Sequence, residues 1–452
     1  LQIEWPEMAF LALLLGSLAF LNIWDFPIYL VLISGIYLIM RANEDGWSWD
    51  RLLDFFHAFF IFAIAGVLIY LPYYIGFSSQ ASGFLPNLLN PTRGIQLWIM
   101  FGTAFLPLFG FYIFHQRESG EGRALGRALL ITSAFVLALL VFSLALAWLL
   151  AGPLGNTSMG QYILGLGAAD LPSLLGESLS RRLSAAGGWI TILLLLAFPL
   201  SGLLSTHKVP KKQASPQSAL TFIYILGLFA ALLITAPEFI FLRDQFSTRM
   251  NTVFKFYMQA WLVLGVVAAV VAVLWIEKTR GVRKVLALSV VTLTIAAASI
   301  YPLFAFPDRY RPSPDSQPSL DASSFLSASE RAAAEWLRTA TEGVLVEAVG
   351  GQYSEFARYA THSGQSGVLG WPGHESQWRG GSAEFGQRQG DIEALYSVSD
   401  WIYAQAIIDR YAIEYVVVGA LERSSYNVNE AKFLTHLDIA YQNDAVTIYQ
   451  IP

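Results

Sequence analysis

One stretch of this apolar chain gathers charged and amide side chains at the approach to a long hydrophobic segment that begins near residue 251. Its members are Glu238, Arg243, Asp244, Arg249, Asn251, Lys255 and Gln259. The last three are spaced four residues apart, so they share one face of a helix. The start of a helix carries partial positive charge, which disfavours cations there and makes that end a ready anion site. The pattern predicts a site for the phosphate of a lipid, because guanidinium and ammonium groups suit phosphate oxygens. The predicted phosphate-binding residues are Arg243, Arg249, Asn251, Lys255 and Gln259.

A second interpretation of the same stretch needs no ligand. Arg243, Asp244 and Arg249 would pair with one another, and Lys255 would extend its ammonium group to lipid headgroups. Structural ion pairs gather charges as ligand sites do, so the residues alone leave both interpretations open.

An acidic residue, Asp25, lies in the segment "NIWDFPIY", where Pro27 favours a break between two apolar runs. A carboxylate at such a break is a candidate catalytic base or metal ligand. Its alternative role is helix capping, or pairing with Arg249 or Lys255. The adjacent pair His374 and Glu375 lacks the spacing of a metal site, so the metal remains unassigned.

A second polar group lies near the other end of the chain, in and beside residues 350–381. Aromatic faces with flanking carboxylates and guanidiniums favour a sugar ring or a sugar phosphate, and a stretch this poor in core residues is typical of a binding loop. The alternative is an irregular loop whose tryptophans contact the membrane surface. The predicted cleft residues are Glu347, Tyr353, Arg358, Trp371, His374, Glu375, Trp378 and Arg379.

The composition places these groups in a membrane protein. The chain has 452 residues, of which 55% are hydrophobic and 13% charged, and its mean hydropathy is +0.50. The net charge of −5 gives no reason to propose nucleic-acid binding. The absence of cysteine excludes disulfides, thiolate metal sites and cysteine nucleophiles. Residue 1 is Leu1 and no basic region precedes the first apolar run, so we expect no cleavable signal and a chain that is processed or part of a longer one.

Nine apolar runs predict a polytopic helical membrane domain over residues 1–303. The expected spans are 6–23, 27–41, 52–74, 96–115, 128–151, 188–206, 218–236, 251–276 and 285–303. One set of loops holds twelve Lys and Arg residues, whereas the longer opposite set (24–26, 75–95, 152–187 and 237–250) holds five. The positive-inside rule places the first set in the cytoplasm, so we expect the chain after the ninth span to lie outside the plasma membrane. Within the outer loops, 171–183 is expected to form a short helix.

A linker over 304–326 and a small extracytoplasmic α/β domain over 327–452 complete the expected architecture. Ser327 or Ser329 would cap a first helix, and the run 343–350 would form a buried strand. A helix near 400–413, a strand at 414–421 and a closing hairpin that turns at Asn443 and Asp444 follow.

Long segments of the chain resemble the YYY family of archaeal and Chloroflexi-type membrane proteins, a domain of unknown function. The segments are "NIWDFPIYL", "LPYYIGFSSQASGFLPNL", "EFIFLRDQFSTRMNTVFKFYMQAW", "VEAVGGQYSEFAR", "VLGWPGHESQWRGG" and "YVVVGALERSSY". That family is distantly similar to the GT-C glycosyltransferases, which take a sugar from a polyprenyl-phosphate donor. The resemblance implies Arg249 and Lys255 as phosphate contacts, Asp25 as an acidic catalytic residue and a divalent metal as one allowed cofactor. A tyrosine run and an acidic segment of the family lie upstream of "WDFP" and have no counterpart here, which puts catalysis by this chain alone in doubt.

Two functions of different classes follow. The first is a membrane glycosyltransferase, or the remnant of one, whose partners are membrane lipids and a polyprenyl-phosphate sugar. The second is a non-catalytic accessory subunit of a larger membrane complex, with other subunits or an upstream chain completing the fold. A transporter ranks third, because the two halves show no matching pair of broken helices.

Overall fold

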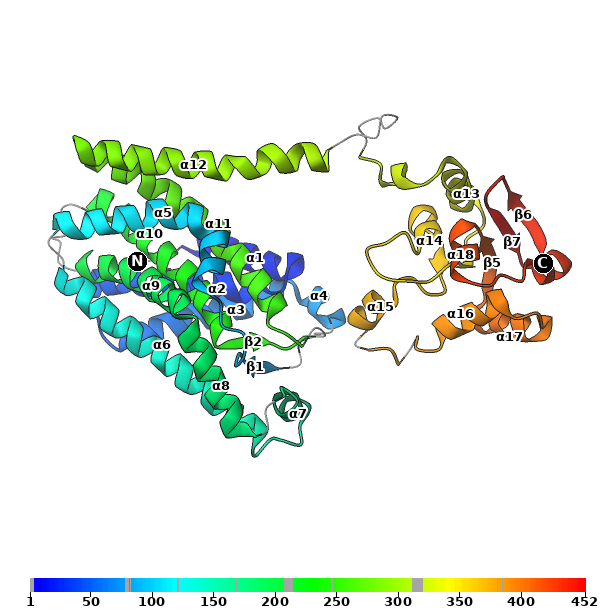
Figure 1. The fold of residues 1–452 in the computed structure, drawn as a ribbon, viewed down its shortest axis with the longest axis horizontal. Helices are drawn as coiled ribbons and strands as arrows, with labels where there is room; N and C mark the ends of the chain where they lie inside the picture. The colour runs from blue at the N-terminus through cyan, green and yellow to red at the C-terminus, as the bar shows by residue number, and fades with distance from the viewer. Residues whose placement is uncertain are drawn as a thin grey trace. The chain divides into compact units, whose positions relative to one another are not determined.

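The computed structural model describes residues 4–77, 81, 83–119, 122–167, 170–206, 214–244, 247–310, 320–379, 381–383 and 385–452. The chain forms two compact units, a helical one that ends at Arg309 and a second that runs from Tyr310 to Pro452 (Figure 1). Each unit has its own hydrophobic core. The predicted fold class, a polytopic helical membrane protein followed by a small α/β region, is confirmed.

The first unit is built from long apolar helices. Their bounds are α1 Trp5–Leu21, α2 Asp25–Asp45, α3 Asp50–Ile69, α4 Leu71–Gly76, α5 Gly94–Ser119, α6 Gly122–Ala151, α7 Ser158–Leu164, α8 Leu171–Ser184, α9 Ala186–Thr206, α10 Ala214–Thr235, α11 Met250–Lys278 and α12 Val282–Arg309. Among the described residues, eight helices are long and apolar enough to cross a membrane. The ninth expected span corresponds to α1, an apolar helix of 17 residues, which is about the minimum length for crossing.

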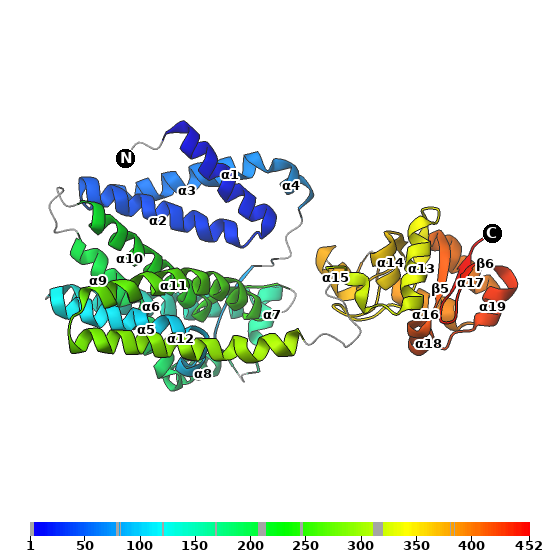
Figure 2. The same ribbon diagram turned by 90° about the horizontal axis from the view of Figure 1, so that it is seen from above.

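The core of this unit lies between α5, α9, α10 and α11, where buried aromatic residues such as Phe101, Phe105 and Tyr224 pack. The first three helices contact one another, and Figure 2 shows them side by side. By contrast, α6 and α12 expose most of their apolar side chains, as helices that face lipid do. The last of these helices continues to Arg309, six residues beyond the expected end of the span.

Two of the loops that are predicted to lie outside are joined by a short antiparallel pair of strands. In this pair, β1 (Phe84–Pro86) lies beside β2 (Ile240–Leu242), with Leu85 opposite Phe241. The backbone N–H of Arg243 extends the pairing by donating to Gly83 O at 2.8 Å. The 3₁₀ turn η2 (Ala236–Glu238) precedes β2. The predicted helix at 171–183 is confirmed as α8, whose Leu174 packs in the same cluster as Leu85 and Phe241. Three of the four loops predicted to lie outside, 75–95, 152–187 and 237–250, therefore meet at one end of the helical unit.

The second unit is a five-stranded mixed sheet with helices on both faces (Figure 1). The strand order is β4-β3-β5-β7-β6, with β3 parallel to β4 and β5, and β7 antiparallel to β5 and β6. The strands are β3 Val344–Val346, β4 Ser366–Gly367, β5 Ile413–Val418, β6 Asp438–Gln442 and β7 Thr447–Gln450. The helices are η3 Ala322–Phe325, α13 Ala328–Thr339, α14 Arg358–Ser363, α15 Pro372–Trp378, α16 Arg388–Ser397, α17 Trp401–Tyr411, α18 Ala420–Ser425 and α19 Glu430–His436.

Alternation along the central strand explains the two faces of this sheet. Tyr415 and Val417 pack against α13, whereas Val416 and Val418 pack against α16, α17 and α19. The predicted helix cap, the two buried strands and the closing hairpin are all present, and Ser327 is the residue that caps α13. The segment between β3 and α16 has little regular structure, and the predicted cleft residues lie largely in it.

Candidate functional site

The carboxylate of Asp25 is held by a chain of two hydrogen bonds. Asp25 is the first residue of α2, and Gln259 lies on α11. The side-chain N–H of Gln259 donates to Asp25 Oδ1 at 3.0 Å, and the hydroxyl of Tyr29 donates to Gln259 Oε1 at 2.6 Å. Because the amide is bonded on both sides, it fixes the orientation of the carboxylate, as a second residue orients a catalytic base in many enzymes.

Lys255 brings a cation close to Asn22, just before α2. It lies one helical turn before Gln259 and on the same face of α11. Its Nζ is 3.5 Å from Asn22 Oδ1, at the limit of a hydrogen bond, and 5.6 Å from the centroid of the Phe254 ring. In the part of the chain that the structure describes, no carboxylate lies within ion-pair distance of this ammonium group. An ammonium group has three donors, so Lys255 retains the capacity to bind an anion.

Arg249, in contrast, is engaged in a buried ion pair. Its Nη1 lies 2.7 Å from Oε1 of Glu238, a carboxylate with 0% exposure, and its Nη2 donates to Thr92 Oγ1 at 2.9 Å. Thr92 donates both its hydroxyl and its backbone N–H, the latter at 2.8 Å, to the same carboxylate. Arg249 therefore holds the loop before α11 to the loop before α5. Its carboxylate partner is Glu238 and not Asp244, which corrects the part of the predicted pairing that involved Arg249.

A second arginine, which sequence reasoning did not single out, lies against this ion pair. Arg182 of α8 is 5% exposed, and its Nη2 donates to the backbone oxygens of Asn87 and, at 3.0 Å, Glu238. Its guanidinium lies 5.4 Å from the ring of Trp189 and 5.3 Å from that of Phe239. The only sequence signal was a cation in a predicted outer loop, 152–187, that contains few cations.

The remaining predicted phosphate contacts have other partners. Asn251 donates to Asp244 Oδ2 at 2.8 Å. Arg243 donates to the hydroxyl of Ser158 at 3.1 Å and lies 6.0 Å from the ring of Tyr162. Of the five predicted contacts, the structure thus joins Gln259 to Asp25, and it places Lys255 against Asn22, three residues before Asp25.

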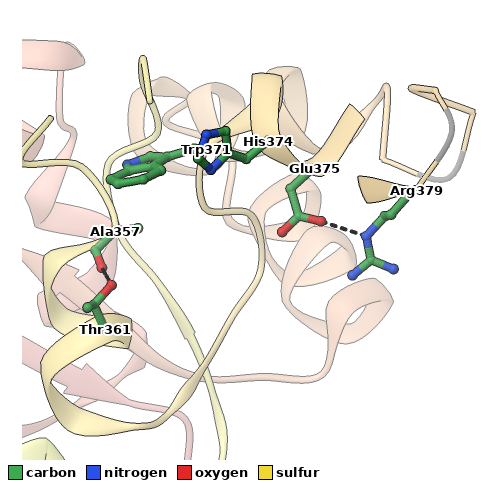
Figure 3. A pocket seen from close by; sticks show the side chains of 6 residues that line it. All are labelled: Ala357, Thr361, Trp371, His374, Glu375 and Arg379. Carbon is green, nitrogen blue, oxygen red and sulfur yellow. Dashed lines mark hydrogen bonds and ion pairs between the residues drawn. The ribbon is translucent and has the colours of Figure 1, made fainter. Parts of the chain in front are cut away.

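Four of the predicted cleft residues line one open pocket in the second unit, and Figure 3 shows them. The pocket has a volume of about 550 Å³, within the ~300–1,000 Å³ range of small-molecule sites. Its lining residues are Ala357, Thr361, Trp371, His374, Glu375 and Arg379. Tyr353 adjoins the pocket, with its ring centroid 4.8 Å from that of His374 and 5.8 Å from that of Trp371. The side chain of Trp378 lies outside the described residues.

Glu347 and Arg358, also predicted for the cleft, are buried supports beneath it. Each is 3% exposed. Glu347 accepts the backbone N–H groups of Tyr359 and Ala360 at 3.0 and 2.8 Å, so it caps α14. Burial raises the pKa of Glu347 to about 7, although these two N–H groups act in the opposite direction. Arg358 forms ion pairs with Glu330 at 3.0 Å and Glu422 at 3.2 Å.

The residues near Asp25 do not fit a metal ion. Within the described ranges, no group of three or more His, Asp or Glu side chains is placed to hold one. A metal usually needs several such ligands, and Asp25 is accompanied by amide and hydroxyl groups instead. No catalytic step is therefore derived through a metal.

Comparison with known proteins gives one match. The family described as "Uncharacterized membrane protein (DUF2298)" matches residues 2–264, which include α1 to α10, the loops between them and the first half of α11. No curated protein and no solved structure matches the chain. The matched segment contains Asp25, Glu238, Arg249, Lys255 and Gln259, whereas the pocket of the second unit lies beyond it. Since the match covers more than half of the chain, this protein belongs to the DUF2298 family of membrane proteins.

Proposed function

We propose that this protein is a GT-C-like membrane glycosyltransferase that takes its sugar from a polyprenyl-phosphate donor. The observation that carries the proposal is that two residues one turn apart on α11 reach the start of α2. Gln259 donates to Asp25, and Lys255 lies 3.5 Å from Asn22, three residues before Asp25. An oriented carboxylate beside a cation without a carboxylate partner suits a reaction that removes a proton and releases a phosphate.

The proposed step uses each group once. Asp25 accepts the proton of an acceptor hydroxyl, and the hydroxyl oxygen forms a bond to the anomeric carbon of the donor sugar. The bond between that carbon and the phosphate oxygen breaks, and the oxygen keeps the electron pair. Lys255 stabilises the negative charge that develops on the leaving polyprenyl phosphate. The remaining predicted phosphate contacts, Arg243, Arg249 and Asn251, would shape the outer loops around the donor.

The same proposal places the site on the outer face of the plasma membrane. The loops that meet around Asp25 and Arg249 are those that are poor in Lys and Arg, which the positive-inside rule places outside. By this rule the second unit also lies outside, after α12.

Native mass spectrometry of the protein purified gently from its own membrane tests the donor site. We expect a bound polyprenyl phosphate in the wild type, and its loss in Lys255→Ala. Lys278→Ala is the matched control, because Lys278 is an exposed lysine at the opposite end of the same helix. Ordinary phospholipid bound equally well by all three forms would refute the donor site.

Asp25→Asn separates chemistry from binding. The asparagine keeps an oxygen that accepts from Gln259 but cannot take up a proton, so donor binding should persist while sugar transfer falls by about 10²–10⁴-fold. Transfer at the wild-type rate would remove Asp25 from the mechanism. Recovery of the protein only within a fixed assembly, without bound donor, would favour the alternative of an accessory subunit.

A further inference from the structure

The pocket of the second unit combines an aromatic wall with a polar edge. Trp371 and His374 form the wall, with their ring centroids 5.2 Å apart (Figure 3). The indole N–H of Trp371 donates to Phe356 O at 2.9 Å, which fixes the ring in place. Glu375 and Arg379 lie one turn apart at the edge of the pocket.

The charge of the pocket argues against an anionic ligand. Arg379 Nε lies 2.5 Å from Oε2 of Glu375, so the guanidinium is neutralised by a carboxylate within the site. Both side chains are partly exposed, at 52% for Arg379 and 30% for Glu375. They therefore offer donors and acceptors to a neutral polar ligand without offering net positive charge to a phosphate.

The backbone beside the pocket is strained. Tyr353 has φ 57° and Ala357 has φ 62°, a left-handed conformation that residues other than glycine rarely adopt. Such conformations concentrate at ligand sites, where the surrounding structure maintains them. The side chain of Tyr353, one of the two strained residues, is 81% exposed, and its ring contacts both His374 and Trp371. Hydrophobic burial does not explain why a tyrosine is held in this position.

We propose that this pocket binds a neutral sugar ring, with Trp371 stacking on one face of the ring and Glu375 and Arg379 bonding to its hydroxyl groups. The C–H face of a pyranose is apolar and carries slight positive charge, which complements the negative face of an aromatic ring, while its hydroxyls need both donors and acceptors. The proposal rests on the pocket alone and does not depend on the proposed transferase activity.

Calorimetric titration of the full chain in nanodiscs with mannotriose, maltotriose and chitotriose tests the proposal, with inorganic phosphate as the comparison ligand. We expect at least one trisaccharide to bind and phosphate not to bind. Trp371→Ala should weaken that binding by about tenfold or more, as loss of a central aromatic contact does. Trp401→Ala is the matched control, since Trp401 also packs against a histidine, His436, in the same unit but away from the pocket lining.

A second variant separates binding from folding. In Tyr353→Gly the glycine relieves the left-handed backbone, so the unit should be as stable as the wild type or more stable, while sugar binding weakens. Lys255→Ala should leave trisaccharide binding unchanged, which distinguishes this pocket from the membrane site. Binding of none of the three sugars, equal binding by Trp371→Ala, or preferential binding of phosphate would each overturn the proposal.

Discussion

At the scale of single residues, Glu347 makes the stability of the second unit depend on pH. Its pKa is about 7 in the folded chain against 4.5 for an ordinary glutamate, so the protonated form is favoured by folding. Stability from this residue is present below pH 4.5 and is lost as the pH rises through about 7, a difference on the order of 3 kcal/mol. Hydrogen exchange in Arg358–Ser363, corrected for its intrinsic pH dependence, should therefore be faster at pH 8 than at pH 5.

The matched variants for this effect are Glu347→Gln and Glu342→Gln. The first removes the titrating group and should make exchange in α14 independent of pH, whereas the second alters an exposed glutamate nearby and should keep the wild-type response. An unchanged pH response in Glu347→Gln would assign the effect to another residue.

The ion pair of Arg249 and Glu238 gives a second prediction about the stability of the protein at the scale of single residues. Arg249→Ala would leave a buried carboxylate without its cation, a change that costs about 3–5 kcal/mol. We expect a marked fall in the apparent melting temperature in detergent. Arg181→Ala breaks an exposed pair with Glu177 and should cost only about 0–1 kcal/mol, so equal melting temperatures for the two variants would contradict the structural role of Arg249.

At the scale of elements, local signals in the sequence predicted helix caps and buried strands, but they did not predict which distant strands pair. The sequence predicts Ser327 or Ser329 as the cap of α13, and in the structure Ser327 caps this helix reciprocally with Glu330. The strand predicted at 414–421 is likewise present, as β5 (Ile413–Val418) at the centre of the sheet. Strands β1 and β2 lie more than 150 residues apart in the chain and are only three residues long each, so neither alternation nor turn residues indicated them.

The candidate site likewise has features that could be predicted from local spacing and contacts that could not. The helical spacing that places Lys255 and Gln259 on one face could be read directly from the sequence. The contacts of Asp25 with Gln259 and of Arg249 with Glu238 depend on how α2, η2 and α11 pack, and no local pattern records that packing. The pocket residues from Trp371 to Arg379 were predicted because they are close together in the chain, whereas the burial of Glu347 and Arg358 was not.

The cap of α13 gives a prediction at this scale. Ser327→Ala removes the acceptor for the Glu330 N–H and should destabilise the second unit by about 1 kcal/mol. Ser329→Ala lies inside the same helix, where alanine is the better helix former, and should be neutral or slightly stabilising. Urea unfolding followed by near-ultraviolet circular dichroism compares the two variants, and equal midpoints would show that the cap contributes nothing measurable.

At the scale of the whole molecule, the side of the membrane on which each unit lies depends on the number of crossings. Eight described helices qualify by length, and the 17 residues of α1 decide whether the total is odd. Three loops with few cations meet through β1, β2 and α8. These loops must therefore lie on the same side of the membrane as one another. We expect this side to be the outside, together with the second unit.

The chain has no cysteine, so single cysteines report their side of the membrane without background. Asn156→Cys in an outer loop and Ser425→Cys in the second unit should react with a membrane-impermeant maleimide on intact cells, because both positions are exposed. Arg280→Cys, between α11 and α12, and Glu4→Cys, before α1, should react only after permeabilisation. Protection of Ser425→Cys with labelling of Asn156→Cys would mean that α12 does not cross. Labelling of Glu4→Cys on intact cells would mean that α1 does not cross and that an even number of helices carries the second unit outside.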